Sequence, residues 1–529
     1  MAPGEIEPPL SHRRETKAYQ EAIMGHHPSK TSSVYNTLLE AAQSRMDKAA
    51  IVYEGQTINF GTLLVRIEQV IRRLKLLGVG RGDAFAIFGQ NHPEHLFCYY
   101  AASRMGAVFV PVNPNLTAGE VDYNFRHSEA KVLFFDDHVE ETARQAVPSA
   151  KLFHISSLTE ASAEAGECQG AIDLDDDFII TYSSGTTGNQ KAIVLDQRAQ
   201  MAVAASLVRM WGISERDTTL VALPLGYLYG FSTAAATGLS VGGTVIILRR
   251  FHPRDVLATF EEYPVTVYHG VPTMFTMMME YCEQRGLRFD LSKVRQLICS
   301  GAPLPEEIAA RFVEKFGKPL QNYYAMTEVA PVFGCYYDDP AELPAGAIGK
   351  AAPGAVIEIK RPDGSECGTD EPGEALVRGA ATLKRYAKDE ELTAASLKDG
   401  LFRSGDLVSR DKDGFYYIVG RIKEIIIRGG HNISPAEVEK ATLRHPAVQD
   451  AAVVGIADRI FGEVPVAFVV LRLDASVSQD ELISFIEGQV SDFKVPRTVH
   501  FVAELPQGKT GKIDKKLLKI RAEEQAAAV

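Results

Sequence analysis

The sequence predicts an α/β protein: a large N-terminal domain of doubly wound, parallel or mixed sheets, a small β subdomain, and a small mobile α+β C-terminal domain. Short apolar runs alternate with helical patterns over the first half, and short runs joined by Asp-Gly turns follow from about residue 356. Strand–helix alternation is typical of parallel sheets covered on both faces. Because 529 residues exceed what one core supports, at least two domains are expected.

Helices and strands alternate in order along the N-terminal part. Apolar residues recur at helical spacing over residues 60–78, and Thr117 is placed to cap a later helix. Helices are expected over residues 60–78, from near 95, over 116–128 and near 198–211. Strands are expected over residues 83–89, 107–114, 131–137, 178–184, 219–225 and 243–250.

Domain boundaries are predicted where the composition and the pattern of apolar residues change. Residues 1–30 are polar and contain prolines, which predicts a loosely ordered lead-in. Residues 31–419 are expected to form the N-terminal domain, whose last part is built of hairpins. Residues 420–529 form a second unit of about a hundred residues, the size of an independent domain.

Composition excludes several functional classes. A net charge of −12 argues against a general nucleic-acid binder. The six cysteines form no C-x-x-C pair, so neither a zinc site nor a disulfide framework is indicated. The N-terminus lacks the apolar core of a signal peptide, and no apolar run is long enough to span a bilayer. We therefore expect a cytoplasmic protein.

The stretch "YSSGTTGNQK", from Tyr182 to Lys191, has the composition of an anion-binding loop. It follows an apolar strand and is expected to precede a helix, at the carboxyl end of a sheet strand where such sheets bind ligands. Glycines allow close backbone approach, hydroxyls donate hydrogen bonds, and the lysine adds positive charge. The spacing is not that of the P-loop of nucleotide triphosphatases. On its own, the loop is equally consistent with a plain Gly/Ser/Thr turn.

Four further motifs accompany this loop. In chain order they are "YYAMTE" (323–328), "RSGDL" (403–407), "GRIKEIIIRGGHNISPAEVE" (420–439) and "LPQGKTGKID" (505–514). With them, the chain from about residue 34 to 518 resembles the adenylate-forming superfamily, which includes acyl- and aryl-CoA synthetases. Five motifs in order are far more specific than one.

The resemblance implies a two-step reaction that uses ATP, Mg²⁺ and CoA. A carboxylate attacks the α-phosphate of ATP to give an acyl-adenylate and pyrophosphate, and a thiol then displaces AMP. Glu328 is expected to bind Mg²⁺ together with Thr186, and Thr327 to meet the α-phosphate. A helix N-cap followed by an acidic residue is the alternative interpretation of Thr327-Glu328. The loop residues expected to contact phosphates are Ser183, Ser184, Gly185, Thr186, Thr187, Gly188 and Lys191.

Further positions are expected to bind the nucleoside. Tyr324 would stack on adenine, although a core aromatic is the alternative. Asp406 would accept hydrogen bonds from the ribose hydroxyls, and Arg421 would also reach the ribose. The turn "SGAPLP" resembles the family's adenine-lining segment, which carries over to Gly301, Ala302 and Pro303.

The C-terminal domain is expected to alternate between two orientations. Lys512 resembles the lysine that assists adenylation, although other lysines surround it and a solvated basic face is the alternative. Gly420 would be the hinge. Gly429 and Gly430 would line the pantetheine tunnel. Likeness to aryl-CoA ligases places four residues near the CoA nucleotide, but core or surface roles explain them almost as well: Phe461, Phe493, Lys494 and Arg497.

The acid itself is the least defined partner. The expected pocket is apolar, aromatic and rich in methionine, although a buried helix face explains the methionines equally well. A hydrophobic monocarboxylate, aryl or medium-chain aliphatic, is expected rather than a dicarboxylate. The residues expected to contact it are Tyr227, His269, Gly270, Ala325, Val329 and Ala330.

The chain departs from the family pattern in its phosphate loop, where "GNQKA" replaces the common G-x-P-K-G. Gln197 stands where many relatives have histidine. The leading interpretation is an acid–CoA ligase, and the alternative is a stand-alone adenylation enzyme that loads a carrier-protein thiol. A luciferase-like oxygenase and a non-catalytic nucleotide-binding regulator are less favoured. The oligomeric state stays open between monomer and homodimer.

Overall fold

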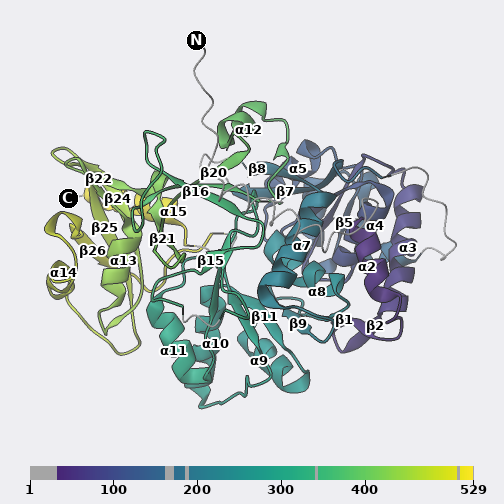
Figure 1. Cartoon of the computed structure of the whole chain (residues 1–529), viewed down its shortest axis with the longest axis horizontal. Helices are drawn as coiled ribbons and strands as arrows, with labels where there is room; N and C mark the ends of the chain where they lie inside the picture. The colour runs from purple at the N-terminus through teal and green to yellow at the C-terminus, as the bar shows by residue number, and fades with distance from the viewer. Residues whose placement is uncertain are drawn as a thin grey trace, which may run out of the picture.

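The computed structural model describes residues 33–160, 172–184, 190–339, 343–379, 381–508 and 513–527. The expected lead-in over residues 1–30 lies outside these ranges, and so do five predicted site residues: Gly185, Thr186, Thr187, Gly188 and Lys512. Figure 1 shows the chain running from the N-terminal sheets to a group of C-terminal strands at the opposite end of the molecule.

One sheet of the N-terminal part has seven strands in the order β18-β8-β7-β4-β3-β5-β6. Its central strands β3 to β7 are parallel, whereas β8 and β18 form an antiparallel edge. The strands are β3 (Ala84–Phe88), β4 (Val108–Val112), β5 (Leu133–Phe135), β6 (Leu152–His154), β7 (Asp177–Ser184), β8 (Gln190–Asp196) and β18 (Arg385–Tyr386).

A second sheet has nine strands in the order β15-β14-β13-β12-β11-β9-β10-β1-β2. Strands β14 and β15 at one edge and β2 at the other are antiparallel, and the strands between them are parallel. The strands are β1 (Ala49–Tyr53), β2 (Gln56–Asn59), β9 (Thr218–Val221), β10 (Thr244–Ile247), β11 (Val267–Gly270), β12 (Gln296–Cys299), β13 (Gln321–Tyr324), β14 (Phe333–Gly334) and β15 (Lys350–Ala351).

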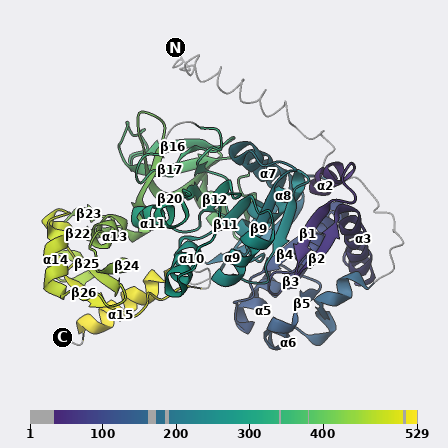
Figure 2. The same cartoon turned by 90° about the horizontal axis from the view of Figure 1, so that it is seen from below.

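Helices cover both faces of these sheets. On β3, Phe85 and Ile87 face a core shared with the second sheet, while Ala86 and Phe88 face the outer helices α5 and α6, seen below β3 and β5 in Figure 2. This alternation is the period of two of a strand that is buried on both sides. Inner and outer helices and helical turns are α2 (Val34–Ala42), α3 (Phe60–Leu76), α4 (Glu94–Met105), α5 (Ala118–His127), η1 (Asp137–Val139), α6 (Glu140–Ala146), η2 (Ser149–Lys151), η3 (Ile155–Thr159), α7 (Gln197–Trp211), η4 (Tyr229–Ala236), α8 (Thr237–Ser240), α9 (Pro253–Glu262), α10 (Pro272–Arg285) and α11 (Glu306–Phe316).

The sequence patterns predicted most of these elements. The helix expected over 60–78 is α3, and Thr117 caps α5 with the reciprocal bonds of a capping box to Glu120. One expectation was wrong. The loop 185–189 does not lead directly into a helix, because the antiparallel strand β8 comes first and pairs with β7, with Ser183 opposite Lys191. The apolar run "AIVL" of β8 is so short that its pattern alone does not distinguish a strand from the start of a helix.

The predicted β subdomain is a small antiparallel sheet. Its turns at Gly364, Gly400 and Gly414 have positive φ, as the Asp-Gly pairs predicted. It contains β16 (Val356–Lys360), β17 (Gly373–Arg378), β19 (Leu397–Lys398), β20 (Leu401–Arg410) and β21 (Tyr416–Arg421), with α12 (Glu390–Ser396) beside it.

The C-terminal strands form a separate sheet in the order β23-β22-β25-β24, with β26 beside β25. Its two hydrophobic clusters draw their members from residues 426 to 522, so this domain has its own core. Its elements are η5 (Ile422–Glu424), β22 (Ile426–Arg428), β23 (His431–Ile433), α13 (Pro435–Leu443), β24 (Val448–Asp458), β25 (Gly462–Leu471), α14 (Gln479–Glu487), η6 (Asp492–Lys494), β26 (Thr498–Phe501) and α15 (Lys515–Ala527). Among the described residues, no helix has the length and apolar character needed to cross a membrane.

Two histidines are fully buried in the N-terminal core. His95 lies on α4, and His269 lies on β11 with both ring nitrogens lacking a hydrogen-bond partner. Burial lowers the pKa of each to about 3, because the apolar surroundings disfavour the imidazolium. Both histidines are therefore neutral in the folded protein at neutral pH.

We predict that His269 makes the fold less stable in acid. The unfolded chain takes up a proton at this residue near pH 6.5 and the folded chain does not, so stability is lost as pH falls from 6.5 towards 3. At pH 5.5 the loss from one such histidine is about 1.4 kcal/mol. His269→Leu should therefore flatten the fall of the thermal unfolding temperature between pH 7.5 and 5.5. An identical fall in both proteins would contradict the prediction.

Candidate active site

A buried carboxylate anchors the part of the site predicted to hold the nucleoside. Asp406, only 2% exposed, lies on β20 directly opposite Arg421 on β21. The Arg421 Nε atom is 2.8 Å from one Asp406 oxygen, and the Tyr324 hydroxyl donates a hydrogen bond to the other. The structure thus brings Tyr324 to Asp406, 82 residues further along the chain, and to the Arg421 that pairs with it. A carboxylate offers about four acceptor positions, so two remain for ribose hydroxyls.

The Tyr324 ring is the first of three stacked aromatic rings. Its centroid lies 5.4 Å from that of Phe333, which lies 4.4 Å from that of Tyr416, with interplanar angles of 24° and 23°. Burial, and then the charge of Asp406, raises the pKa of Tyr324, so the hydroxyl keeps its proton. An adenine that stacks on Tyr324 must use the face opposite Phe333.

The turn predicted to line the adenine site follows β12. Gly301 has φ of +88°, and a Cβ there would lie 3.1 Å from a Val271 methyl group. A glycine therefore fits this position both in conformation and in space. Ala302 and Pro303 continue the turn towards α11.

A second group of residues forms around Glu328. The Tyr386 hydroxyl donates to Glu328 Oε1 at 3.0 Å, and Lys191 Nζ lies 5.2 Å from the centre of the Tyr386 ring. Burial, and then Glu328, raises the pKa of Tyr386. The predicted phosphate-binding lysine and the predicted Mg²⁺ ligand thus contact one tyrosine that sequence reasoning missed. The segment "LKRYAKD" carries no spacing signal that would have indicated it.

The oxygen-bearing side chains around Glu328 fit a Mg²⁺ ion that is bound together with a nucleotide. Among the described residues, no group of three or more His, Cys, Asp or Glu side chains could form a protein-only metal cage. Mg²⁺ usually keeps several waters and binds through one or two carboxylates plus substrate phosphates. Glu328 is one such carboxylate, and Thr327 lies beside it in a turn closed by the Met326 N–H donating to the Val329 carbonyl at 3.0 Å.

The residues predicted to contact the acid do not all face one space. The side-chain amide of Asn113, which follows β4, donates to the Tyr227 hydroxyl, and burial raises the pKa of this tyrosine to about 12. Ala325 and Ala330 pack against one aromatic cluster, whereas Val329 is completely buried. The sequence analysis predicted no role for Asn113. A polar residue directly after a buried parallel strand is the signal that could have indicated it, because such sheets bind ligands at this end.

The aromatic cluster consists of Trp211, Tyr229, His269 and Tyr323. The His269 ring centroid lies 5.2 Å from that of Trp211 and 5.8 Å from that of Tyr229, and both contacts are edge-on. The Tyr229 hydroxyl donates to the Gly270 carbonyl at 3.2 Å. Two of the residues predicted to contact the acid, Ala325 and Ala330, pack against the hydrophobic cluster that contains Trp211 and Tyr323.

The predicted hinge is tightly packed. Gly420 lies in β21, and a Cβ at this position would lie 2.8 Å from Ser434 Oγ. The Ser434 hydroxyl donates to the Val419 carbonyl at 2.6 Å. The glycine thus makes room for a hydrogen bond between the last strand of the β subdomain and the C-terminal domain.

The residues predicted to bind CoA gather on the C-terminal domain. Gly429 and Gly430 form an exposed turn between β22 and β23, with φ of +57° and +86°. Phe461 is 42% exposed, and Phe493 stacks on His431 with 4.6 Å between ring centroids. His431 lies within the quoted motif of residues 420–439, but no role was predicted for it.

Both cations predicted near the CoA phosphates have acidic partners. Arg497 pairs with Asp458, and Lys494 Nζ lies 2.6 Å from Glu437. A phosphate would have to compete with these carboxylates. The assignment of both cations to CoA stays a prediction.

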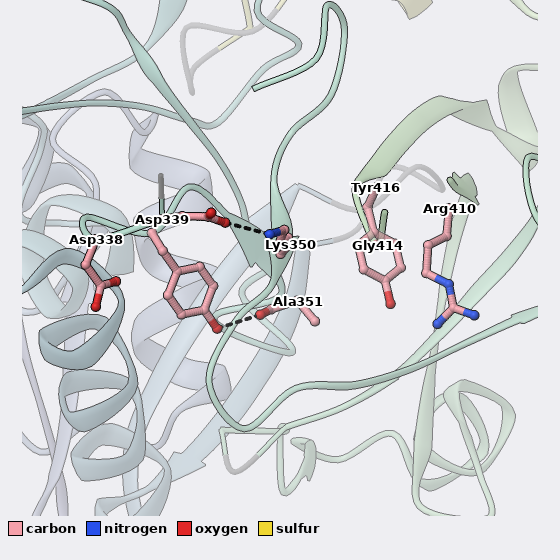
Figure 3. A pocket seen from close by; sticks show the side chains of 8 residues that line it. Asp338, Asp339, Lys350, Ala351, Arg410, Gly414 and Tyr416 are labelled. Carbon is pink, nitrogen blue, oxygen red and sulfur yellow. Dashed lines mark hydrogen bonds and ion pairs between the residues drawn. The ribbon is translucent and has the colours of Figure 1, made fainter. Parts of the chain in front are cut away.

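A separate pocket of about 510 Å³ opens beside β15 and the β20–β21 turn (Figure 3). The ion pair between Lys350 and Asp339, 2.7 Å long, lies on one side of it, and Tyr416 and Arg410 lie on the other. Of the predicted site residues that the structure describes, none lines it. Because Tyr416 belongs to the aromatic stack, the pocket lies behind that stack rather than beside Asp406.

Comparison with known proteins identifies the family. Residues 38–387 match the AMP-binding enzyme family, and residues 437–512 match its C-terminal domain. The chain is 34% identical over 468 residues to feruloyl-CoA synthase from Amycolatopsis sp, an alignment that covers 88% of this chain and 94% of the relative.

Solved structures agree. ATP-bound MatB from Rhodopseudomonas palustris superposes with a TM-score of 0.84 at 29% identity, covering 93% of this chain and 99% of the other. The o-succinylbenzoate coenzyme A synthetase of Bacillus subtilis, in complex with ATP and magnesium ion, gives 0.82 at 30% identity, covering 92% and 99%. The chain therefore belongs to the AMP-binding enzyme family, the adenylate-forming superfamily, and within it to the AMP-forming acyl- or aryl-CoA synthetases.

Proposed function

We propose that the protein activates a hydrophobic aryl monocarboxylate and transfers it to CoA. ATP, Mg²⁺ and CoA are the co-substrates and metal of this enzyme type. The observation that carries the aryl preference is the aromatic cluster of Trp211, Tyr229, His269 and Tyr323, next to which Ala325 and Ala330 pack. Aromatic side chains make edge-to-face contacts with a planar aryl acid. A flexible aliphatic acid would lose more conformational entropy on binding than a planar one.

The first step is proposed to be adenylation. A carboxylate oxygen of the acid forms a bond to the α-phosphorus while the bond to the bridging oxygen of pyrophosphate breaks. Lys191 and the loop N–H groups offset the charge of the β- and γ-phosphates. Glu328 would hold Mg²⁺, which supplies further charge neutralisation when bound. Asp406 would hold the ribose, because its carboxylate retains acceptor positions beside Tyr324 and Arg421.

The second step is proposed to form the thioester. The CoA sulfur, which has lost its proton, forms a bond to the acyl carbon, and the bond from that carbon to the phosphate oxygen breaks to release AMP. Gly429 and Gly430 would border the path of pantetheine. They lie in an exposed turn in this structure, so a rotation of the C-terminal domain about Gly420 would have to bring them to the acyl group.

The experiment that tests the substrate class is a panel of acids. Aryl propenoic and arylacetic acids and C6–C12 fatty acids would be supplied with ATP and Mg²⁺, with and without CoA, and AMP and thioester would be measured. We expect kcat/KM at least about tenfold higher for the best aryl acid, a difference of about 1.4 kcal/mol. A fatty acid as the best substrate would refute the aryl preference. Acyl-adenylate without thioester would favour the carrier-protein alternative.

We also predict that Lys512 separates the two half-reactions. Lys512→Ala should lower the rate of adenylation by at least about a hundredfold, because a positive charge beside the developing phosphate charge is lost. Thioester formation from preformed acyl-adenylate should change by less than about threefold. Lys519→Ala, in α15, is a control that removes another lysine of the same C-terminal segment, whose ammonium lies 3.4 Å from Glu463. Equal loss in both half-reactions would contradict the domain rotation.

A further inference from the structure

One short segment links the two charged groups of the candidate phosphate site. The Leu383 N–H donates to the Glu328 carbonyl at 2.6 Å, and the Ala387 N–H donates to the Ala192 carbonyl at 2.8 Å. Residues 385–386 between them form β18, which pairs with β8. The segment therefore fixes the distance between the turn that carries Glu328 and the strand that carries Lys191.

Tyr386 extends this link through its side chain. It is 2% exposed, and its own N–H donates to Thr393 Oγ1 of α12 at 3.0 Å. Its hydroxyl holds Glu328 and its ring lies beside the Lys191 ammonium. Among the described residues, Lys191 and Glu328 form no ion pair with one another or with any other side chain.

We propose that Tyr386 is a positioning residue that orients Glu328 for the metal ion and Lys191 for ATP without pairing either of them with an opposite charge. The proposal rests on the proposed function, in which Glu328 holds Mg²⁺ and Lys191 contacts phosphate.

The physical argument concerns charge. An arginine or lysine beside Glu328 would orient the carboxylate but also cancel its charge, which would weaken its attraction for a divalent cation. A neutral phenol orients the carboxylate by a hydrogen bond and leaves the charge in place. An aromatic face likewise attracts an ammonium without neutralising it. One tyrosine can therefore serve an anion and a cation together.

The contrast between Glu328 and Asp406 supports the argument that a neutral partner suits a carboxylate predicted to bind a metal ion. Asp406 is paired with Arg421, which suits a carboxylate predicted to accept hydrogen bonds from neutral ribose hydroxyls. Glu328 has a phenol in place of the guanidinium. Removing a residue that orients a metal ligand in this way typically lowers metal affinity or activity by about 10- to 100-fold.

The test measures metal binding directly. Mn²⁺ would replace Mg²⁺, and its affinity for the enzyme–ATP complex would be measured by electron paramagnetic resonance, with ATP affinity in EDTA measured by calorimetry. The variant is Tyr386→Phe, which keeps the ring. The matched control is Tyr417→Phe, which removes a phenol that donates to the Asp411 carboxylate at 2.9 Å, within the β subdomain.

We expect Tyr386→Phe to weaken Mn²⁺ binding by about tenfold, to change ATP affinity without metal by less than about twofold, and to leave the unfolding temperature close to that of Tyr417→Phe. Unchanged Mn²⁺ affinity would overturn the proposal. An equal loss of ATP affinity in EDTA would also overturn it, because it would indicate a general distortion of the site.

A second variant tests the ring. Tyr386→Leu should additionally weaken ATP binding in EDTA by about threefold, because Lys191 loses its aromatic contact. This extra loss should disappear in the Lys191→Ala background, since the two residues act together. An equal extra loss in both backgrounds would exclude any action through Lys191. Lack of acid-dependent AMP formation by the unmodified enzyme would instead refute the proposed function.

Discussion

The core between the two large sheets is the constraint on which the rest of the structure depends. Parallel strands must be covered on both faces, and here one helical layer covers an inner face of each sheet. Several of the predicted site residues therefore lie at the points where strands end. Asn113 follows β4, Gly301 follows β12, and Tyr324 ends β13. The candidate site is assembled at these ends because the strands themselves leave no room for it.

Electrostatics divides the candidate site into two parts. Asp406 lies beside a guanidinium and is nearly inaccessible, whereas Glu328 lies beside a neutral phenol. A buried carboxylate without a partner would be costly, so Arg421 stabilises Asp406 before any ligand arrives. Glu328 is less buried and needs no such partner. The difference in burial thus accompanies the difference in the ligands proposed for the two carboxylates.

Much of this organisation was predictable from the sequence, and the exceptions have physical reasons. Repeated apolar patterns and the Thr117 capping box are local, so they predicted helices and strands well. Strand β8 was missed because its apolar run is short and directly precedes α7, so its pattern does not separate it from that helix. Motifs placed Tyr324, Asp406 and Arg421 together. Tyr386 could not be found, because its importance arises only from contacts with Glu328 and Lys191, which lie 58 and 195 residues away in the numbering.

The packing of the C-terminal domain would allow the proposed rotation at low cost. Its hydrophobic clusters lie within residues 426–522, so a rotation would expose little core. Its contacts with the N-terminal domain include an ion pair between Lys440 and Glu306 and a hydrogen bond from Gln449 to Glu280, at 2.7 and 2.9 Å. An exposed ion pair such as Lys440–Glu306 contributes about 1 kcal/mol or less. The Ser434 bond at the hinge is more buried and fits only because residue 420 lacks a Cβ. A glycine at the proposed hinge therefore stabilises the observed orientation by packing, where a charged side chain would have no room.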